Sequence, residues 1–210
     1  VIVVDQEIDV FAYKLKQLWK DPTPMRAMQV DLDLIYAPGD AEQTDRNLGE
    51  LIERLVAMQV NTVFLQAFAD PDGDGNVSRV YFHNRVLPVE ADIFAHAVHQ
   101  IKIRGIKVYA WLPVMSYIFP DDTFNRKFHV QEFKNGQTSP SSSWYRRLTP
   151  FSDQVAQKVG LLFEDLAAGA QISGVLFQDD AYLTDFEDFH PMAIDAFKDK
   201  TGGHVTPEQL

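Results

Sequence analysis

Two pairs of acidic residues stand at the ends of short apolar segments of the sequence. Asp179 and Asp180 follow residues 174–178 directly, and Asp31 and Asp33 lie in a similar segment at residues 27–34. A short apolar run is typical of a buried strand in a parallel sheet. In α/β proteins, ligand and catalytic groups gather where such strands end. The sequence therefore predicts an acidic cleft, whose carboxylates could exchange protons with a substrate or coordinate Mg²⁺.

Segments of strand length alternate with amphipathic segments of helix length along most of the chain. We expect strands at 27–34, 61–66, 106–112 and 172–178, and helices at 41–58, 91–104, 151–168 and 191–200. Strand-then-helix units in succession predict a parallel sheet with right-handed crossovers. A complete (β/α)₈ barrel takes about 250 residues. The expected fold class is therefore α/β and TIM-barrel-like, with about the first half of a (β/α)₈ barrel present.

The connections between these elements differ in length. The helix-to-strand connections are short, whereas the strand-to-helix loops at 67–90, 113–150 and 181–190 are long. Long loops on one face of a βα repeat are how barrel enzymes build a site. We expect residues 1–23 to be a lead-in or linker segment and residues 24–210 to be a partial barrel domain. The chain is interpreted as a piece of a longer precursor.

The overall composition narrows the possible partners. A net charge of -11 argues against binding to nucleic acids or anionic membranes, which would repel the protein. Neutral or cationic partners remain open, including polymers that carry free amines, although acidity also serves solubility. The chain has no cysteine, which excludes disulfides, thiolate nucleophiles and cysteine-ligated zinc. We find neither a signal-peptide pattern nor an apolar run of the roughly 20 residues that a membrane span needs.

Several longer motifs, in order along the chain, carry a resemblance to a known family. The chain resembles the C-terminal glycoside hydrolase domain of the bacterial poly-β-1,6-N-acetyl-D-glucosamine N-deacetylases. The matching stretches cover roughly residues 23–203 and lie at 28–33, 45–48, 62–75, 81–88, 108–114 and 177–181. The resemblance implies a TIM-barrel-type domain that binds, and in the family cleaves, partly deacetylated poly-N-acetylglucosamine, a periplasmic biofilm exopolysaccharide.

The resemblance also implies how the domain is used. In the family a separate N-terminal domain performs metal-dependent deacetylation, and its Asp/His/His metal set is not in this sequence. We therefore expect a glycoside hydrolase that needs no cofactor or metal and takes a polysaccharide as its partner. We also expect it to be fused to a deacetylase domain in the full-length protein, and to be periplasmic or exported.

The expected catalytic groups lie after the last predicted strand. Glycoside hydrolysis uses one carboxylic acid to protonate the leaving oxygen and a second carboxylate as base or nucleophile. Asp179 and Asp180 alternate in direction along an extended strand end, so only one should face the cleft. We expect Asp180 to be the acid, with Asp179 orienting it or binding sugar hydroxyls, and Asp185 to be a further catalytic candidate. The alternative is that the pair forms a helix cap and a solvated loop acid.

The expected substrate contacts are acids and aromatic rings. Asp31 and Asp33, which should share one side of their strand, are assigned to glucosamine ammonium and hydroxyl groups. Asp70, just past the second strand, and Glu187, in the loop after the last strand, are further substrate-binding candidates. Alternatively, Asp31 and Asp33 are buried structural acids. Aromatic residues can stack on the faces of sugars. Trp111 and Tyr182 are preferred as platforms within a wider aromatic set that also includes Tyr36, Tyr117, Trp144 and Tyr145.

Three functions remain open. The first is hydrolysis of a β-1,6-linked glucosamine polymer, and the second is binding of that polymer without cleavage. The third is a phosphohydrolase with Mg²⁺ bound by Asp31, Asp33, Asp179 and Asp180, which ranks last because no glycine loop or basic clamp would hold phosphate. Residues 70–75 resemble half of an EF-hand loop, but the twelfth position is Tyr81 instead of the required glutamate, which favours an acidic turn.

Overall fold

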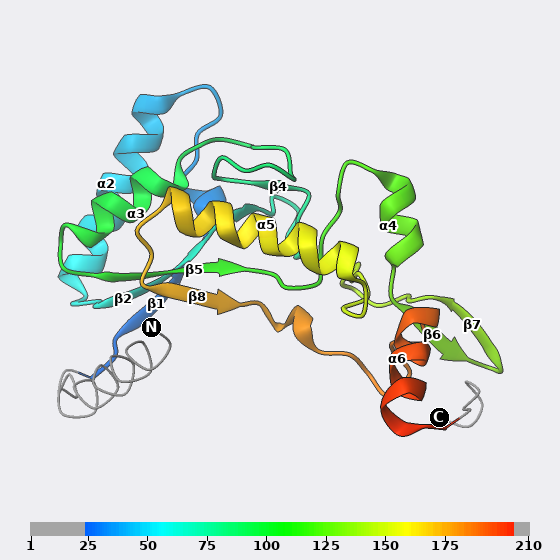
Figure 1. Cartoon of the computed structure of the whole chain (residues 1–210). Helices are drawn as coiled ribbons and strands as arrows, with labels where there is room; N and C mark the ends of the chain where they lie inside the picture. Colours follow the sequence, from blue (N-terminus) through cyan, green and yellow to red (C-terminus); the bar gives the residue numbers. More distant parts are fainter. Residues whose placement is uncertain (1–23, 204–210) are drawn as a thin grey trace, which may run out of the picture.

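A four-stranded parallel sheet forms the centre of the computed structural model, which describes residues 24–203. Its strands are β1 (Ala27–Val30), β2 (Thr62–Gln66), β5 (Lys107–Leu112) and β8 (Gly174–Phe177), in the spatial order β1-β2-β5-β8 (Figure 1). Each strand pairs in parallel with the next one of the βα repeat. The expected parallel sheet of four strands is therefore confirmed. The expected lead-in at residues 1–23 lies outside the described residues.

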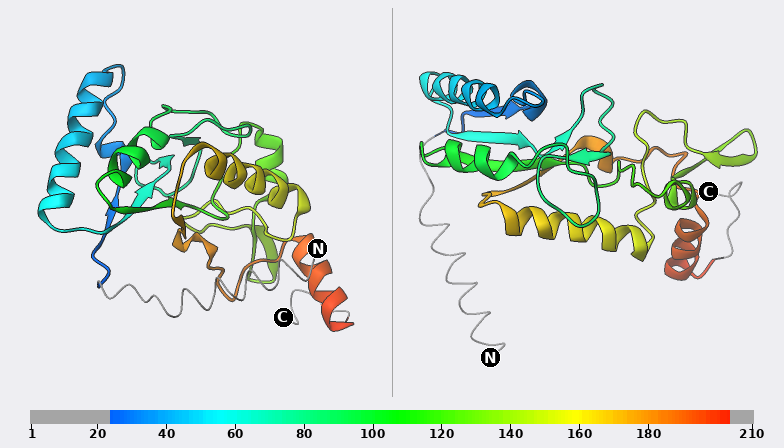
Figure 2. Two further views of the ribbon diagram at one scale, coloured as in Figure 1. Left: turned by 60° about the vertical axis from the view of Figure 1, so that its left-hand side comes forward. Right: turned by 90° about the horizontal axis from the view of Figure 1, so that it is seen from above.

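Three helices connect these strands: α2 (Ala41–Ala57), α3 (Phe94–Lys102) and α5 (Asp153–Gly169), arranged in an arc outside the sheet (Figure 2). Two of them begin at a side-chain cap, because Asp40 accepts a hydrogen bond from the backbone of Gln43 and Ser152 accepts one from Val155. The apolar stripe of α2, with Leu48, Ile52 and Leu55, is buried in the same core as the sheet residues. This amphipathic pattern is what the sequence predicted for residues 41–58.

The two faces of the sheet differ in burial. On the face that packs in the helical core, Val63, Leu65 and Val108 are fully buried. Side chains alternate along each strand, so Phe64 and Trp111 point to the opposite face, and both are only partly buried. In a TIM barrel this second face is the inner one. The sheet thus has the layering of a barrel wall.

The long loops at the carboxyl edge contain regular structure that the sequence did not predict. The loop after β2 contains the short strands β3 (Phe68–Ala69) and β4 (Arg79–Val80). The loop after β5 contains helix α4 (Asp122–Phe128) and a hairpin of β6 (Gln131–Lys134) with β7 (Gln137–Pro140). The hairpin turn is Asn135-Gly136, and both residues have positive φ, as a tight two-residue turn requires.

Two boundaries differ from the expected ones where the backbone turns. β1 ends at Val30, and residues Leu32–Leu34 form a 3₁₀ helix, because fully buried Leu32 turns the chain into the core. After β8, Asp179–Ala181 form a second 3₁₀ helix, and α6 (Pro191–Thr201) closes the described chain. Among the helices of residues 24–203, none combines the length and apolar character needed to cross a membrane.

Candidate functional site

Asp180 is a buried anchor between two loops. Its side chain is fully buried, and its carboxylate accepts hydrogen bonds from three successive backbone amides in the loop after β5, those of Val114 at 3.1 Å, Met115 at 2.6 Å and Ser116 at 2.7 Å. These bonds use the carboxylate oxygens and tie the end of β8 to the end of β5. A general acid has to reach the substrate oxygen, so this geometry argues against the role expected for Asp180.

Asp179 is the member of the pair that faces solvent. It is exposed on the same 3₁₀ turn, and the hydroxyl of Tyr145 donates a hydrogen bond to its Oδ1 at 2.6 Å. Burial, followed by this hydrogen bond, raises the pKa of Tyr145, so the phenol keeps its proton and acts as a donor. The expectation that one acid of the pair faces the cleft agrees with these exposures. The accessible acid, however, is Asp179.

Asp33 lies beside the loop after β2. Its carboxylate accepts hydrogen bonds from the hydroxyl of Tyr81 at 2.5 Å and from the backbone amide of Asp70 at 3.0 Å. Burial and the bond to Asp33 raise the pKa of Tyr81 well above its ordinary value. The Tyr36 ring meets Tyr81 edge-on, with centroids 5.7 Å apart. Asp33 and Tyr36 line one cavity of about 410 Å³ together with Pro71, Arg79 and Glu90.

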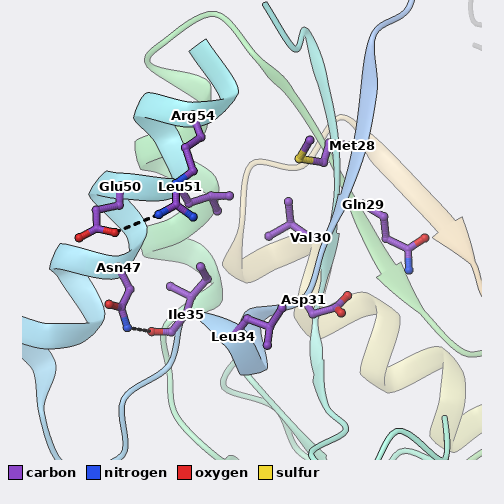
Figure 3. A pocket seen from close by; sticks show the side chains of 10 residues that line it. All are labelled: Met28, Gln29, Val30, Asp31, Leu34, Ile35, Asn47, Glu50, Leu51 and Arg54. Atoms are coloured by element: carbon purple, nitrogen blue, oxygen red, sulfur yellow. Dashed lines mark hydrogen bonds and ion pairs between the residues drawn. The ribbon is translucent and has the colours of Figure 1, made fainter. Parts of the chain in front are cut away.

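Asp31 and Asp33 do not share a strand face, contrary to the expectation from the sequence. Since β1 ends at Val30, the period-2 alternation stops before these two acids. Asp31 lines a cavity of about 290 Å³ between β1 and α2, with its carboxylate directed away from the helix (Figure 3). Burial, with a smaller contribution from the charge of Asp33, raises the pKa of Asp31. An amine bound there would relieve that unfavourable environment.

Asp70 opens an acidic turn. Its carboxylate accepts the Gly75 backbone amide at 3.1 Å, and the Asp74 side chain accepts the amide of Asn76 at 2.8 Å. Burial raises the pKa of Asp70, the Gly75 hydrogen bond opposes this shift, and the charges of Asp74 and Asp72 add to it. One oxygen from each of the three carboxylates lies within 4.8 Å of the others, a spacing that one cation could bridge. The hydrogen bonds are those of the turn expected from the sequence.

Glu187 does not face a substrate site. Its side chain and that of Arg147 are each only 3% exposed, and they form an ion pair at 2.8 Å. The hydroxyl groups of Ser141 and Thr184 also donate to this carboxylate. Burial alone would raise the pKa of Glu187, but these hydrogen bonds and the Arg147 charge outweigh it and lower the pKa. The substrate-binding role expected for Glu187 is therefore not supported, because its oxygens are already occupied.

The remaining candidates differ in accessibility. Asp185 is exposed in the loop after β8, and Tyr182 is 70% exposed there, with its carbonyl bound to Arg147. Trp111 is partly buried on the inner face of β5 and meets the Phe68 ring edge-on at 5.4 Å. Tyr182 is thus free to act as a platform, and Trp111 presents part of its ring. Of the wider aromatic set, Tyr117 is buried packing.

Contacts run continuously from the first acid to the last. Asp33 binds the amide of Asp70, Asp70 binds the amide of Gly75, and Gly75 packs against the ring of Tyr145, which holds Asp179. Acids from the two outer strands of the sheet are therefore joined along one edge. The sequence placed Tyr145 among the aromatic candidates but could not show that it holds Asp179, because Asp179 and Gly75 lie 34 and 70 residues away from it. Its position in a long strand-to-helix loop was the available signal.

The chain is similar to known proteins over most of its length. The chain is 46% identical over 181 residues to the poly-beta-1,6-N-acetyl-D-glucosamine N-deacetylase of Escherichia coli K12, covering 85% of this chain but 26% of that protein. It matches the glycoside hydrolase domain of PgaB (BpsB) from Bordetella bronchiseptica with a TM-score of 0.76 and 42% identity, over 88% of this chain and 52% of that one. The chain thus spans about a quarter of its curated relatives.

More distant structures support the fold alone. An alpha-L-fucosidase isoenzyme from Paenibacillus thiaminolyticus matches 88% of this chain and 27% of its own at a TM-score of 0.57 and 15% identity. With the parallel βα repeat, these matches confirm the TIM-barrel-like α/β fold. A family model described as hypothetical glycosyl hydrolase family 13 matches residues 29–205, which is most of the sequence. The chain belongs to this glycosyl hydrolase family.

Proposed function

We propose that this domain binds partly deacetylated poly-β-1,6-N-acetyl-D-glucosamine and hydrolyses glycosidic bonds in the interior of the polymer. The observation that carries the proposal is the row of acids along one sheet edge, from Asp33 through Asp70 to exposed Asp179. Free amines on such a polymer are cationic and would pair with these carboxylates. Family membership and similarity to the Bordetella glycoside hydrolase domain support the same reaction class.

Each candidate has a role that its surroundings allow. Asp179 is the catalytic carboxyl group at the glycosidic oxygen, with Asp185 as the second exposed carboxylate. The hydroxyl of Tyr145 donates a hydrogen bond to Asp179. Asp180 binds the backbone of the loop after β5, which also carries Tyr145, and so anchors that loop to the end of β8. Asp31, Asp33 and Asp70 bind amines and hydroxyls, while Tyr36, Trp111 and Tyr182 offer ring surface to the sugars.

We also assign the domain a wider context from its relatives. The curated relatives are named as N-deacetylases and are about four times as long as the matched segment. A domain of this family fused to a deacetylase would receive polymer that has just gained free amines. The corresponding location is the periplasm or another exported compartment.

The direct test incubates the full chain with partly deacetylated polymer and follows chain length by mass spectrometry. Shorter oligosaccharides from the wild type, and none from Asp179→Asn, are expected. If the wild type binds the polymer but does not cleave it, the domain is a polysaccharide-binding module and the proposal of hydrolysis is refuted. Cleavage that continues at the wild-type rate in Asp179→Asn would refute the assignment of the catalytic group.

The same assay discriminates against a metal-dependent phosphohydrolase. That function would need Asp180 as a metal ligand, but its carboxylate is filled by backbone amides. We therefore expect unchanged cleavage of the polymer after treatment with a chelator. Loss of cleavage that Mg²⁺ restores would favour the metal-dependent reaction.

A further inference from the structure

Two loops that are far apart in the sequence are joined around Tyr145. The buried side chain of Asn76 accepts a hydrogen bond from the Arg146 amide at 2.6 Å, and its Nδ2 donates to the Trp144 carbonyl at 3.5 Å. These backbone groups belong to the residues on either side of Tyr145. One asparagine from the loop after β2 therefore fixes the backbone that carries this tyrosine in the loop after β5.

Gly75, the residue before Asn76, fixes the ring. It has φ of +70°, and a Cβ placed on it would lie 2.6 Å from Cε1 of Tyr145 and 2.7 Å from Nε2 of Gln178. Such distances are shorter than van der Waals contact allows, so the tyrosine ring occupies the space that any other residue would need. The amide of Gln178 also donates to the Gly75 carbonyl at 3.3 Å, which ties the glycine to the residue before Asp179.

We infer that Gly75 and Asn76 are positioning residues for Asp179 and act through Tyr145. Both are buried, so neither touches the polymer, whereas Tyr145 reaches the exposed carboxylate of Asp179 at 2.6 Å. The loop after β2 thereby sets the direction in which an acid after β8 points. This inference rests on the proposed function for its effect on catalysis, but the contact itself exists independently of any reaction.

The consequence of losing the contact is a misdirected carboxylate. Asp179 lies on an exposed turn, and the bond from Tyr145 is its one hydrogen bond from another side chain among the described residues. Displacement of a catalytic group by about 1 Å can cost up to about 100-fold in rate. The carboxyl group of Asp179 is still present in such a variant but is misdirected, and the residues that bind the polymer are unchanged. We therefore expect kcat to fall about tenfold with little change in KM.

The test compares Gly75→Ala with Gly73→Ala in the full chain. Gly73 has the same φ of +70° in the same loop, but a Cβ there meets nothing within 4 Å. Both variants therefore carry the same backbone strain, but only Gly75→Ala collides with the Tyr145 ring and the Gln178 amide. We expect kcat to fall about tenfold in Gly75→Ala and to stay within about twofold of wild type in Gly73→Ala.

Tyr145→Phe completes the design. It should lower kcat by a similar factor, and the double variant should be no slower than Gly75→Ala alone, because the bond that Tyr145→Phe removes is already lost when the ring is displaced. Losses that multiply, or a change confined to KM, would overturn the inference. If Gly75→Ala does not fold, Asn76→Asp is used instead, since it keeps the acceptor for Arg146 but loses the donor to the Trp144 and Asp74 carbonyls.

A structural readout separates this inference from the proposed function. In protein labelled at the tyrosine ring, we expect the NMR signal of Tyr145, assigned with Tyr145→Phe, to shift in Gly75→Ala and to remain in place in Gly73→Ala. A wild-type protein that does not cleave the polymer would refute the hydrolase but leave this readout intact. A Tyr145 signal that stays unchanged in Gly75→Ala would overturn the positioning role whatever the activity.

Discussion

Replacing each of the two adjacent acids by asparagine should separate a structural carboxylate from a functional one. All three backbone amides contact Oδ2, so Asp180→Asn can keep that acceptor, but its NH₂ group then takes the place of Oδ1 as a buried donor that faces the Val114 amide. An unsatisfied buried donor costs about 1–3 kcal/mol, and each remaining bond loses about 1 kcal/mol when its acceptor becomes neutral. We therefore expect the free energy of unfolding to fall by about 4 kcal/mol, which lowers Tm by roughly 10 °C.

Asp179→Asn is the matched control. Its side chain is exposed, and an amide oxygen can still accept the hydroxyl of Tyr145, so the free energy of unfolding should change by less than about 0.5 kcal/mol. Urea unfolding followed by circular dichroism measures both variants. We expect Asp179→Asn to abolish cleavage at unchanged stability. Equal urea midpoints for the two variants, or a larger loss in Asp179→Asn, would refute the assignment of Asp180 as the buried anchor.

Three further predictions concern other parts of the structure. Glu187→Gln should lower the free energy of unfolding by about 3 kcal/mol at pH 7, since it breaks a buried ion pair. Because the pKa of Glu187 is lowered in the fold, the difference from wild type in urea titrations should shrink once the pH falls below the ordinary glutamate pKa of about 4.3, and should disappear only below the lowered pKa. Asp31→Asn should raise the free energy of unfolding slightly at pH 7, because the fold raises the pKa of Asp31 and so disfavours its charge. This gain should vanish at pH 3, where the carboxyl group is protonated in both the folded and the unfolded protein. The same variant should bind glucosamine oligomers more weakly than wild type in calorimetric titrations. Gly174→Ala should destabilise by about 1–3 kcal/mol, because the new Cβ would lie 2.8 Å from the Tyr109 ring, whereas Gly160→Ala in open space on α5 should be neutral or stabilising in the same thermal melts.

Local patterns in the sequence were enough for the wall of the barrel. Strands β1, β2, β5 and β8 lie within the expected segments, because runs of apolar residues and amphipathic helices report burial directly. The Asn135-Gly136 dipeptide is an equally local turn signal, but the hairpin that it forms was not among the predicted elements. The end of β1 was less predictable, since Leu32 turns the chain into a core formed by distant elements.

The roles of the acids were decided by contacts across the fold. The sequence alone placed acidic groups at one edge of a parallel sheet, because strand polarity fixes which loops meet there. It could not show which of Asp179 and Asp180 is accessible, or that the Glu187 carboxylate is paired with Arg147. These properties depend on partners that lie 34 to 66 residues away in the sequence. Burial and hydrogen bonding determine whether a carboxylate is available for chemistry, and only the tertiary structure brings the necessary donors together.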